Sequence, residues 1–156
     1  MWRWGALAAV LVIILDQLSK WVILTQVMDP PVAISVLPIF DLVLAWNRGV
    51  SFSMFTSDSA QAPYFLAGFA ILVVGLLGFL LARVKAPLPA MGLGLVIGGA
   101  LGNVIDRLRF GAVVDFLYFH YAGWGWPAFN LADSAITVGV GLLLLDGLFG
   151  KVRPAK

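Results

Sequence analysis

The stretch PYFLAGFAILVVGLLGFLLA, residues 63–82, decides the fold class of this chain. It carries no charged residue and has about the length that a helix needs to cross a bilayer, roughly 20 mostly apolar residues. Three other segments have a similar character, at residues 4–27, 88–105 and 131–149. We therefore predict four transmembrane helices in one polytopic membrane domain spanning residues 1–156.

The composition of the whole chain agrees with a membrane protein. Of its 156 residues, 62% are hydrophobic and 12% are charged, against roughly 45–50% apolar and about 25% charged in soluble domains. Too little polar surface remains to cover a water-soluble core. The absence of cysteine excludes disulfides, thiolate nucleophiles and cysteine-ligated metals. A net charge of +2 without basic runs gives no sign of nucleic-acid binding.

The orientation follows from the basic residues outside the spans. They precede the first span, separate the second from the third, and follow the fourth, and an even number of spans places these three positions on one side. By the positive-inside rule that side is the cytoplasm, so both termini are expected there. The connections at about 28–62 and 106–130 then face outward, into the periplasm or the extracellular space. The basic residues are Arg3, Arg83, Lys85, Lys151, Arg153 and Lys156.

The two outer connections differ in pattern. Residues 32–46 are rich in β-branched and aromatic residues and are interrupted by prolines, which predicts a small extramembrane sheet or cradle resting on the membrane surface. The second connection concentrates aromatic residues between 116 and 126, which indicates an interfacial loop or helix. Within the third span, Gly94, Gly98 and Gly102 repeat at the spacing that lets another helix approach closely.

Charged residues inside the spans need a partner or a task, because a charge at the bilayer centre costs at least about 2.5–3.5 kcal/mol. Asp16 and Lys20 are four residues apart on one face of the first span, where they can neutralise each other. A structural ion pair and a contact with substrate both remain open for them. Lys20 could also extend toward the outer end of the span.

The outer end of the third span carries a second polar group. Asn103 and Arg107 share one helical face, and the five donors of a guanidinium make a strong clamp for a carboxylate or phosphate. For the neighbouring Asp106 we expect a surface pairing with Arg109.

Two aspartates stand out as candidate catalytic groups. Asp115 is framed by apolar residues in GAVVDF, and Asp133 follows FNLA at the start of the fourth span. Burial raises the pKa of a carboxyl, whereas the N-terminus of a helix lowers it. Two carboxyls in such unlike surroundings can share one proton, as an aspartic hydrolase requires. The alternative for Asp133 is structural, because Asn130 and Asp133 have the spacing of a capping box.

Other catalytic arrangements have little support in the sequence. His120 is the single histidine, so a multi-histidine metal site is excluded, and we interpret it as an interfacial side chain. A dyad of Lys20 with Ser51 or Ser53 can be drawn, but nothing in the sequence fixes their distance. Neither a phosphate-binding glycine loop nor a dinucleotide fingerprint is present, and no metal or cofactor is expected.

Five short blocks in order resemble the bacterial lipoprotein signal peptidases, also called signal peptidase II. Each block alone is weak, but five in order on a four-span chain are highly specific. The blocks begin at Asp16, Asn47, Gly102, Val113 and Phe129 and read DQLSK, NRGVSF, GNVIDR, VVDF and FNLADS.

This resemblance implies an aspartic endopeptidase of the bacterial inner membrane, with its active site toward the periplasm. Its substrates would be prolipoproteins that already carry a diacylglyceryl group on cysteine, cut just before that cysteine, and inhibition by globomycin-type compounds would be expected. The family pattern makes Asp115 and Asp133 the catalytic pair. It implies substrate-binding or supporting roles for Asp16, Lys20, Asn47, Gly49, Asn103, Arg107 and Asn130. We expect a monomer in contact with membrane lipid.

The main alternative is a small proton-coupled membrane transporter, since charged residues within spans also mark ion pathways. A transporter predicts polar residues spread through the membrane depth and an inverted repeat. The sequence shows no internal repeat, and apart from Asp16 its polar residues gather near one end of the spans.

Overall fold

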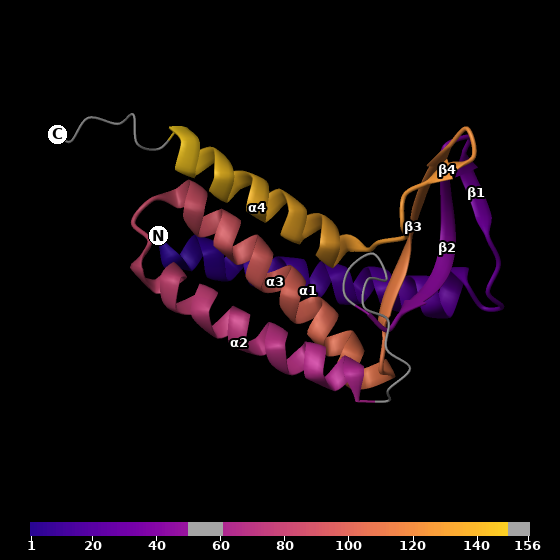
Figure 1. Cartoon of the computed structure of the whole chain (residues 1–156), viewed down its shortest axis with the longest axis horizontal. Coiled ribbons are helices and arrows are strands. Elements are labelled where there is room, and N and C mark those ends of the chain that lie inside the picture. The colour runs from indigo at the N-terminus through magenta and orange to yellow at the C-terminus, as the bar shows by residue number, and fades with distance from the viewer. Residues whose placement is uncertain (50–60, 150–156) are drawn as a thin grey trace.

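The computed structural model describes residues 1–49 and 61–149 (Figure 1). Residues 50–60 and 150–156 lie outside the described part, and so do the end of the NRGVSF block, both serines of the alternative dyad and the basic residues after the fourth span. Within the described part, four helices are long and apolar enough to cross a membrane, as predicted. They are α1 (Trp2–Val22), which continues into the π-helical η1 (Ile23–Val27), α2 (Ala62–Arg83), α3 (Pro87–Phe110) and α4 (Leu131–Phe149).

Helix α3 is longer than predicted. It begins at Pro87, a residue well suited to the first turn of a helix, and it runs to Phe110 rather than ending at residue 105. Gly111 ends it with a left-handed backbone (φ 70°), and its N–H donates to the carbonyl of Arg107 at 3.1 Å. Asp106 and Arg107 therefore lie on the helix and not in the outer connection. Hydropathy ends a span where charges begin, but helical hydrogen bonds do not require apolar side chains.

Helix α3 occupies the centre of the bundle and packs against α1, α2 and α4 (Figure 1). A methyl group at Gly98 would lie 2.7 Å from the carbonyl oxygen of Ala9 on α1, and one at Gly99 would overlap the carbonyl oxygen of Ala132 on α4. These distances leave no room for a Cβ, so the predicted close approach of a neighbouring helix to the third span is confirmed.

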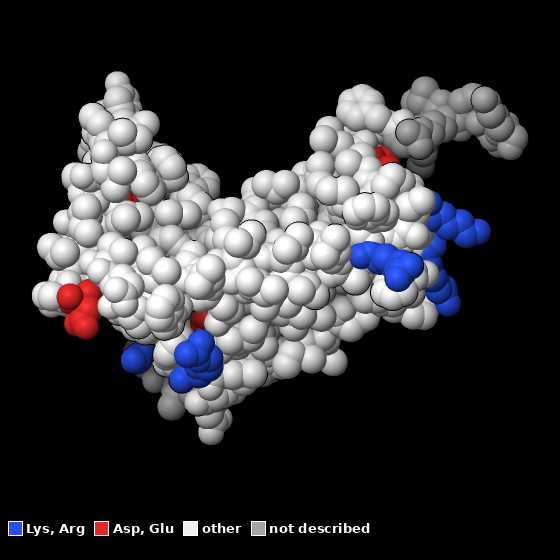
Figure 2. Space-filling model, turned by 180° about the vertical axis from the view of Figure 1, so that it is seen from behind, with Lys and Arg blue, Asp and Glu red and all other residues white. Residues whose placement is uncertain are grey.

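The outer faces of the helices are apolar. On α2, for example, Phe65 is 75% exposed and Leu72 is 74% exposed, as expected for side chains that face lipid. The face drawn in Figure 2 is largely free of charged side chains along its middle, and Lys and Arg gather toward the two ends of the bundle. Such a surface fits a bilayer between two polar ends.

The predicted extramembrane sheet is present. Its four strands are β1 (Ile34–Leu37), β2 (Phe40–Asn47), β3 (Val113–Tyr121) and β4 (Trp124–Gly125), antiparallel in the order β1-β2-β3-β4. Figure 1 shows the sheet at the end of the bundle opposite the start of α1 and the end of α4, with its strands running across the direction of the helices.

The second outer connection contributes β3 and β4 to the sheet, which the interfacial interpretation of its aromatic residues did not anticipate. Phe116 is 5% exposed and packs with Ile23, Met28 and Val114 in a core between the sheet and η1. Tyr121, near the tip of the sheet, is 73% exposed. The aromatic run therefore divides along β3, whose first four residues are buried near the helices and whose last residue is exposed.

Candidate active site

Strand β3 carries Asp115 to the junction between the sheet and the helices. Asp115 lies opposite Ala45 of β2 in the antiparallel ladder. After β4 the chain returns along β3, where Phe129 forms a bridge with Leu117. This return places Asn130 beside Asp115, and the Asn130 Nδ2 group donates to Asp115 Oδ1 at 2.8 Å.

Asn130 also begins the helix that carries Asp133. The Asp133 backbone N–H donates to Asn130 Oδ1 at 2.9 Å, and the Asn130 N–H donates to Asp133 Oδ2 at 3.4 Å. This reciprocal pair is the predicted capping box. Because the same Asn130 side chain reaches Asp115, the cap and the candidate site are one structure: Asn130 links the two carboxyl groups.

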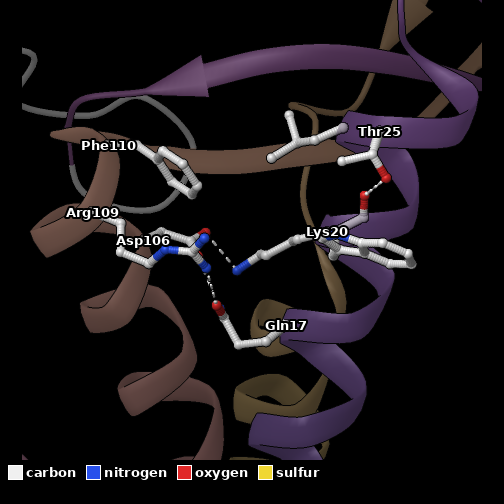
Figure 3. Close-up of a pocket in the computed structure, with 8 residues that line it drawn as sticks. Gln17, Lys20, Thr25, Asp106, Arg109 and Phe110 are labelled. Atoms are coloured by element: carbon white, nitrogen blue, oxygen red, sulfur yellow. Dashed lines mark hydrogen bonds and ion pairs between the residues drawn. The ribbon is translucent and has the colours of Figure 1, made fainter.

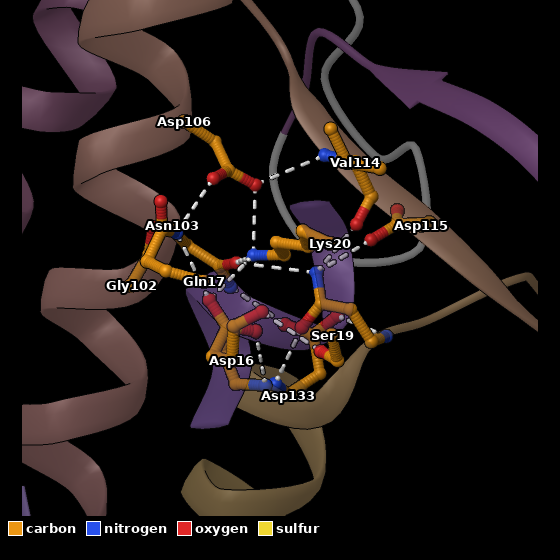
Figure 4. A network of polar contacts seen from close by, with 12 residues as sticks. Asp16, Gln17, Ser19, Lys20, Gly102, Asn103, Asp106, Val114, Asp115 and Asp133 are labelled. Atoms are coloured by element: carbon orange, nitrogen blue, oxygen red, sulfur yellow. Dashed lines mark hydrogen bonds and ion pairs between the residues drawn. The ribbon is translucent and has the colours of Figure 1, made fainter. Parts of the chain in front are cut away.

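Two further asparagines complete the surroundings of the carboxyls. Asn47 Nδ2 donates to Asp115 Oδ2 at 3.1 Å, and Asn103 Nδ2 donates to Asp133 Oδ1 at 2.8 Å. Figure 4 shows Asn103, Asp115 and Asp133 converging from α3, β3 and α4. Each carboxyl thus receives hydrogen bonds from neutral amides, which orient it without a direct ion pair to any residue that the structure describes.

The two carboxyls differ in exposure. Asp115 is 2% exposed, whereas Asp133 is only partly buried. Burial, with the charge of Asp133 adding to it, raises the pKa of Asp115 to about 7, although hydrogen bonds from Asn47 and Asn130 act in the opposite direction. Asp115 therefore keeps its proton to a much higher pH than an ordinary aspartate does.

Arg107 lies within the same site. Its Nη2 donates to the carbonyl of Gly49 at 2.8 Å, and its Nη1 lies 3.4 Å from the carbonyl of Asn103. The charges of Asp115 and Asp133 act on its guanidinium. Its Nε is buried and has no hydrogen-bond partner among the residues that the structure describes. Among the described residues, one donor of a well-held guanidinium is thus unpaired beside the carboxyl pair.

Asp16, Lys20 and Asp106 form a buried ion cluster next to this pair (Figure 4). Lys20 Nζ lies 2.8 Å from Asp16 Oδ2 and 2.7 Å from Asp106 Oδ2, and all three side chains are almost fully buried. The ion pair within the first span is confirmed, but Lys20 does not extend to the outer surface. The predicted surface pairing of Asp106 with Arg109 is wrong, because Asp106 is 0% exposed and points inward to Lys20.

A cavity of about 270 Å³ borders this ion cluster between α1 and the end of α3 (Figure 3). Arg109 lies at its wall, where Nη1 is 3.4 Å from Gln17 Oε1. Asp115 and Asp133 are not among the residues that line it. The cavity is therefore distinct from the place where the candidate catalytic carboxyls meet.

His120 lies far along β3 from this site. Its Nε2 is 3.0 Å from Asp41 Oδ2 on β2, and its ring stacks on Tyr118. A hydrogen bond from Ser35, together with His120, lowers the pKa of Asp41. His120 thus takes part in pairing within the sheet.

The structure brings together all nine residues that the sequence singled out for the site, and it adds two. Asp106 was assigned to the surface, and Gln17 was not considered, although each lies inside one of the blocks that carry the resemblance. Gln17 Nε2 donates to Asp106 Oδ1 at 2.9 Å and lies 3.2 Å from Asp16 Oδ2. The position of both residues inside those blocks was the signal that could have revealed them.

These features define a class: a polytopic membrane protein with two carboxyl groups held together where its helices meet an extramembrane sheet. Comparisons with known proteins narrow the class. The family model for signal peptidase (SPase) II, peptidase A8, matches residues 8–149. The chain belongs to this family of peptidases, and it is a multi-pass protein of the inner membrane.

Relatives and solved structures agree. A lipoprotein signal peptidase of Azoarcus sp. (strain BH72) is 51% identical over 99% of this chain and 88% of the relative. One from Nitrobacter hamburgensis is 47% identical over 92% of this chain and 91% of the relative. A solved bacterial membrane enzyme superposes with a TM-score of 0.80 at 30% identity, covering 97% of this chain and 94% of the other.

Proposed function

We propose that Asp115 and Asp133 are the catalytic pair of a lipoprotein signal peptidase and hydrolyse the peptide bond without a covalent intermediate. The observation that carries this proposal is the Asn130 link: one side chain donates to Asp115 and caps the helix at Asp133. Two carboxyls held in this way, one buried and one partly exposed, have the unlike surroundings that an acid–base pair needs.

In the proposed reaction, Asp133 as carboxylate accepts a proton from water while the water oxygen attacks the scissile carbonyl carbon. Asp115 as acid donates its proton to the carbonyl oxygen, which gives a neutral tetrahedral diol. The pKa of about 7 supports Asp115 as the protonated member at neutral pH. Collapse of the diol breaks the C–N bond: the nitrogen takes the proton from Asp133, and one hydroxyl of the diol returns a proton to Asp115. Asp133 is then a carboxylate and Asp115 an acid again, as at the start.

Arg107 is proposed to hold the substrate backbone. Its Nη groups are engaged by protein carbonyls, but its Nε has no partner among the described residues. A buried N–H without a partner is unfavourable by about 1–3 kcal/mol, and a carbonyl oxygen of the substrate beside the scissile bond would satisfy it. Such a contact would orient the bond toward the carboxyl pair.

The proposed substrate is a prolipoprotein whose cysteine carries a diacylglyceryl group, cleaved just before that cysteine. Asp133 lies at the first turn of α4, a helix whose outer face is apolar and exposed. A signal helix that approaches from the bilayer could keep its acyl chains in lipid while its scissile bond reaches Asp133. The active site would face the periplasm and both termini the cytoplasm, since Arg3, Arg83 and Lys85 lie at the helix ends opposite the sheet.

The test uses purified protein in detergent and a lipidated precursor peptide. Asp115→Asn and Asp133→Asn should each lower kcat by roughly 10²–10⁴-fold, the contribution typical of a general acid or base, and globomycin should inhibit the wild type. Asp146→Asn, at the other end of α4, is the matched control and should cleave normally. Cleavage near the wild-type rate by either of the first two variants would show that the pair is assigned wrongly.

A further inference from the structure

We propose that Asp106 is a positioning residue for Asp115, and that Asp16 is a positioning residue for Asp133. Lys20 forms an ion pair with both Asp106 and Asp16 and so connects the two. This inference rests on the proposed catalytic pair. The backbone N–H of Val114, the residue before Asp115, donates to Asp106 Oδ2 at 3.1 Å. The backbone N–H of the residue before Asp133 makes the corresponding contact, donating to Asp16 Oδ1 at 3.0 Å.

Asp106 and Asp16 share two side-chain donors, Lys20 and Gln17. Lys20 Nζ lies 2.7 Å from Asp106 and 2.8 Å from Asp16, and Gln17 Nε2 lies 2.9 Å and 3.2 Å from the same two carboxylates. Every oxygen of both carboxylates therefore has at least one donor within hydrogen-bonding distance. A buried, fully satisfied network of this kind is rigid, because each broken contact leaves a buried polar group without a partner.

Asp106 and Asp16 act on the catalytic carboxyls through the backbone, because each holds the N–H of the residue that precedes one of them. Asp106 holds the start of β3 against α3, and Asp16 holds the start of α4 against α1. Lys20 and Gln17 contact both carboxylates and therefore help to fix the distance between Asp115 and Asp133. No direct hydrogen bond joins Asp106 to Asp115 or Asp133 within the described part of the chain. Since a displacement of about 1 Å in a catalytic group can lower a rate by roughly 100-fold, this tie is expected to control kcat.

The critical comparison is between Asp106→Ala and Asp106→Asn. Both substitutions remove the negative charge, and both leave Lys20 paired with Asp16, but only asparagine keeps an oxygen that can accept from Val114. A position effect predicts that the alanine variant loses more activity than the asparagine variant. An effect of charge alone predicts equal losses. We expect kcat to fall roughly 10–100-fold in Asp106→Ala and by a smaller factor in Asp106→Asn, with KM unchanged in both.

The pH profile of kcat supplies a readout that a loss of folded protein would not move. Asp115 faces Asp133 from α4, Lys20 from α1 and Arg107 from α3. If β3 moves away from α4, the charge of Asp133 acts less on Asp115 and the pKa of Asp115 falls. The basic limb of the profile should then shift to lower pH, further in Asp106→Ala than in Asp106→Asn.

Asp41→Asn is the control, because it removes an acid from the same sheet at a position paired with β3 but distant from the ion cluster. It should match the wild type in kcat and in the basic limb. Equal losses in the two Asp106 variants, or wild-type kinetics in folded Asp106→Ala, would overturn the inference. If Asp106→Ala fails to accumulate, a loss of kcat of roughly 10-fold or more in folded Asp106→Asn, which keeps the acceptor for Val114, would do so. Asp115→Asn is measured alongside the Asp106 variants. If it loses activity, the proposed catalytic pair stands even where the Asp106 variants overturn the positioning inference.

Discussion

The substitution Asp115→Asn should change the pH dependence of stability in a way that the structure quantifies. The pKa of Asp115 rises from the ordinary value of 3.8 to about 7 in the folded protein. The folded state therefore binds a proton that the unfolded state releases at lower pH, and this contribution to stability is lost as pH rises through about 7. At about 1.4 kcal/mol per pKa unit, the loss amounts to about 4 kcal/mol across that window.

Asparagine at this position does not titrate, so the variant does not lose this free energy of unfolding as the pH rises. It has one oxygen where Asp115 has two, and both of these accept hydrogen bonds, from Asn47 and Asn130. The side-chain N–H of either Asn47 or Asn130 then faces the N–H₂ group of the new asparagine and loses its acceptor. This loss is unfavourable by about 1–3 kcal/mol at every pH. We expect the variant to be less stable than the wild type in acid and to gain on it by about 3 kcal/mol between pH 4.5 and pH 8.

The measurement is the free energy of unfolding of both proteins in mixed micelles, titrated with a denaturing detergent at several pH values. Gly141→Ala, which changes no titrating group and has no atom within 4 Å of the added methyl, provides the control and should run parallel to the wild type over the whole range. A difference between Asp115→Asn and the wild type that stays constant from pH 4.5 to pH 8 would refute the raised pKa of Asp115. It would also remove the argument for Asp115 as the protonated member of the pair.

Two other substitutions test the packing and the clamp. Gly102→Ala places a methyl group 2.6 Å from Asp16 Oδ2 and should lower the free energy of unfolding by about 1–3 kcal/mol. The control Gly141→Ala has no atom within 4 Å of its methyl group and should leave this free energy equal or slightly higher. Equal free energies of unfolding in the two variants would contradict the close packing at Gly102. Arg107→Lys keeps the charge but loses the planar fork that reaches Gly49 and whose Nε has no partner among the described residues. The kcat/KM for the lipidated peptide should therefore fall roughly 10-fold or more, and an unchanged value would exclude the proposed clamp.

The membrane spans and the sheet were predictable because their signals are local. A helix that crosses the bilayer must place about 20 apolar residues in a row, and residues 63–82 do so regardless of their neighbours. The β-branched and aromatic pattern at 32–46 likewise predicted strands that the structure contains. The end of α3 was predicted wrongly, because hydropathy stops at Asp106 while the helix continues to Phe110.

The candidate site was also partly readable from the sequence. The capping spacing of Asn130 and Asp133 is a local signal, and the structure shows the cap. The apolar frame of Asp115 indicated a buried carboxyl, and its side chain is 2% exposed. That one asparagine connects both carboxyls could not be read from spacing, because Asp115 reaches Asn130 through the return of the chain along β3.

Only the tertiary structure decided the role of Asp106. In the sequence its nearest positive neighbours are Arg107 and Arg109, and a surface pairing with Arg109 was the simplest expectation. In the folded protein Lys20 of α1 meets Asp106 in the interior, and Asp106 accepts the amide of Val114. The sequence by itself determined which segments enter the membrane, since transfer into lipid depends on the residues of each segment. The pairing of buried charges depends on which helices lie side by side, and close packing of glycine-rich α3 against α1 decides that.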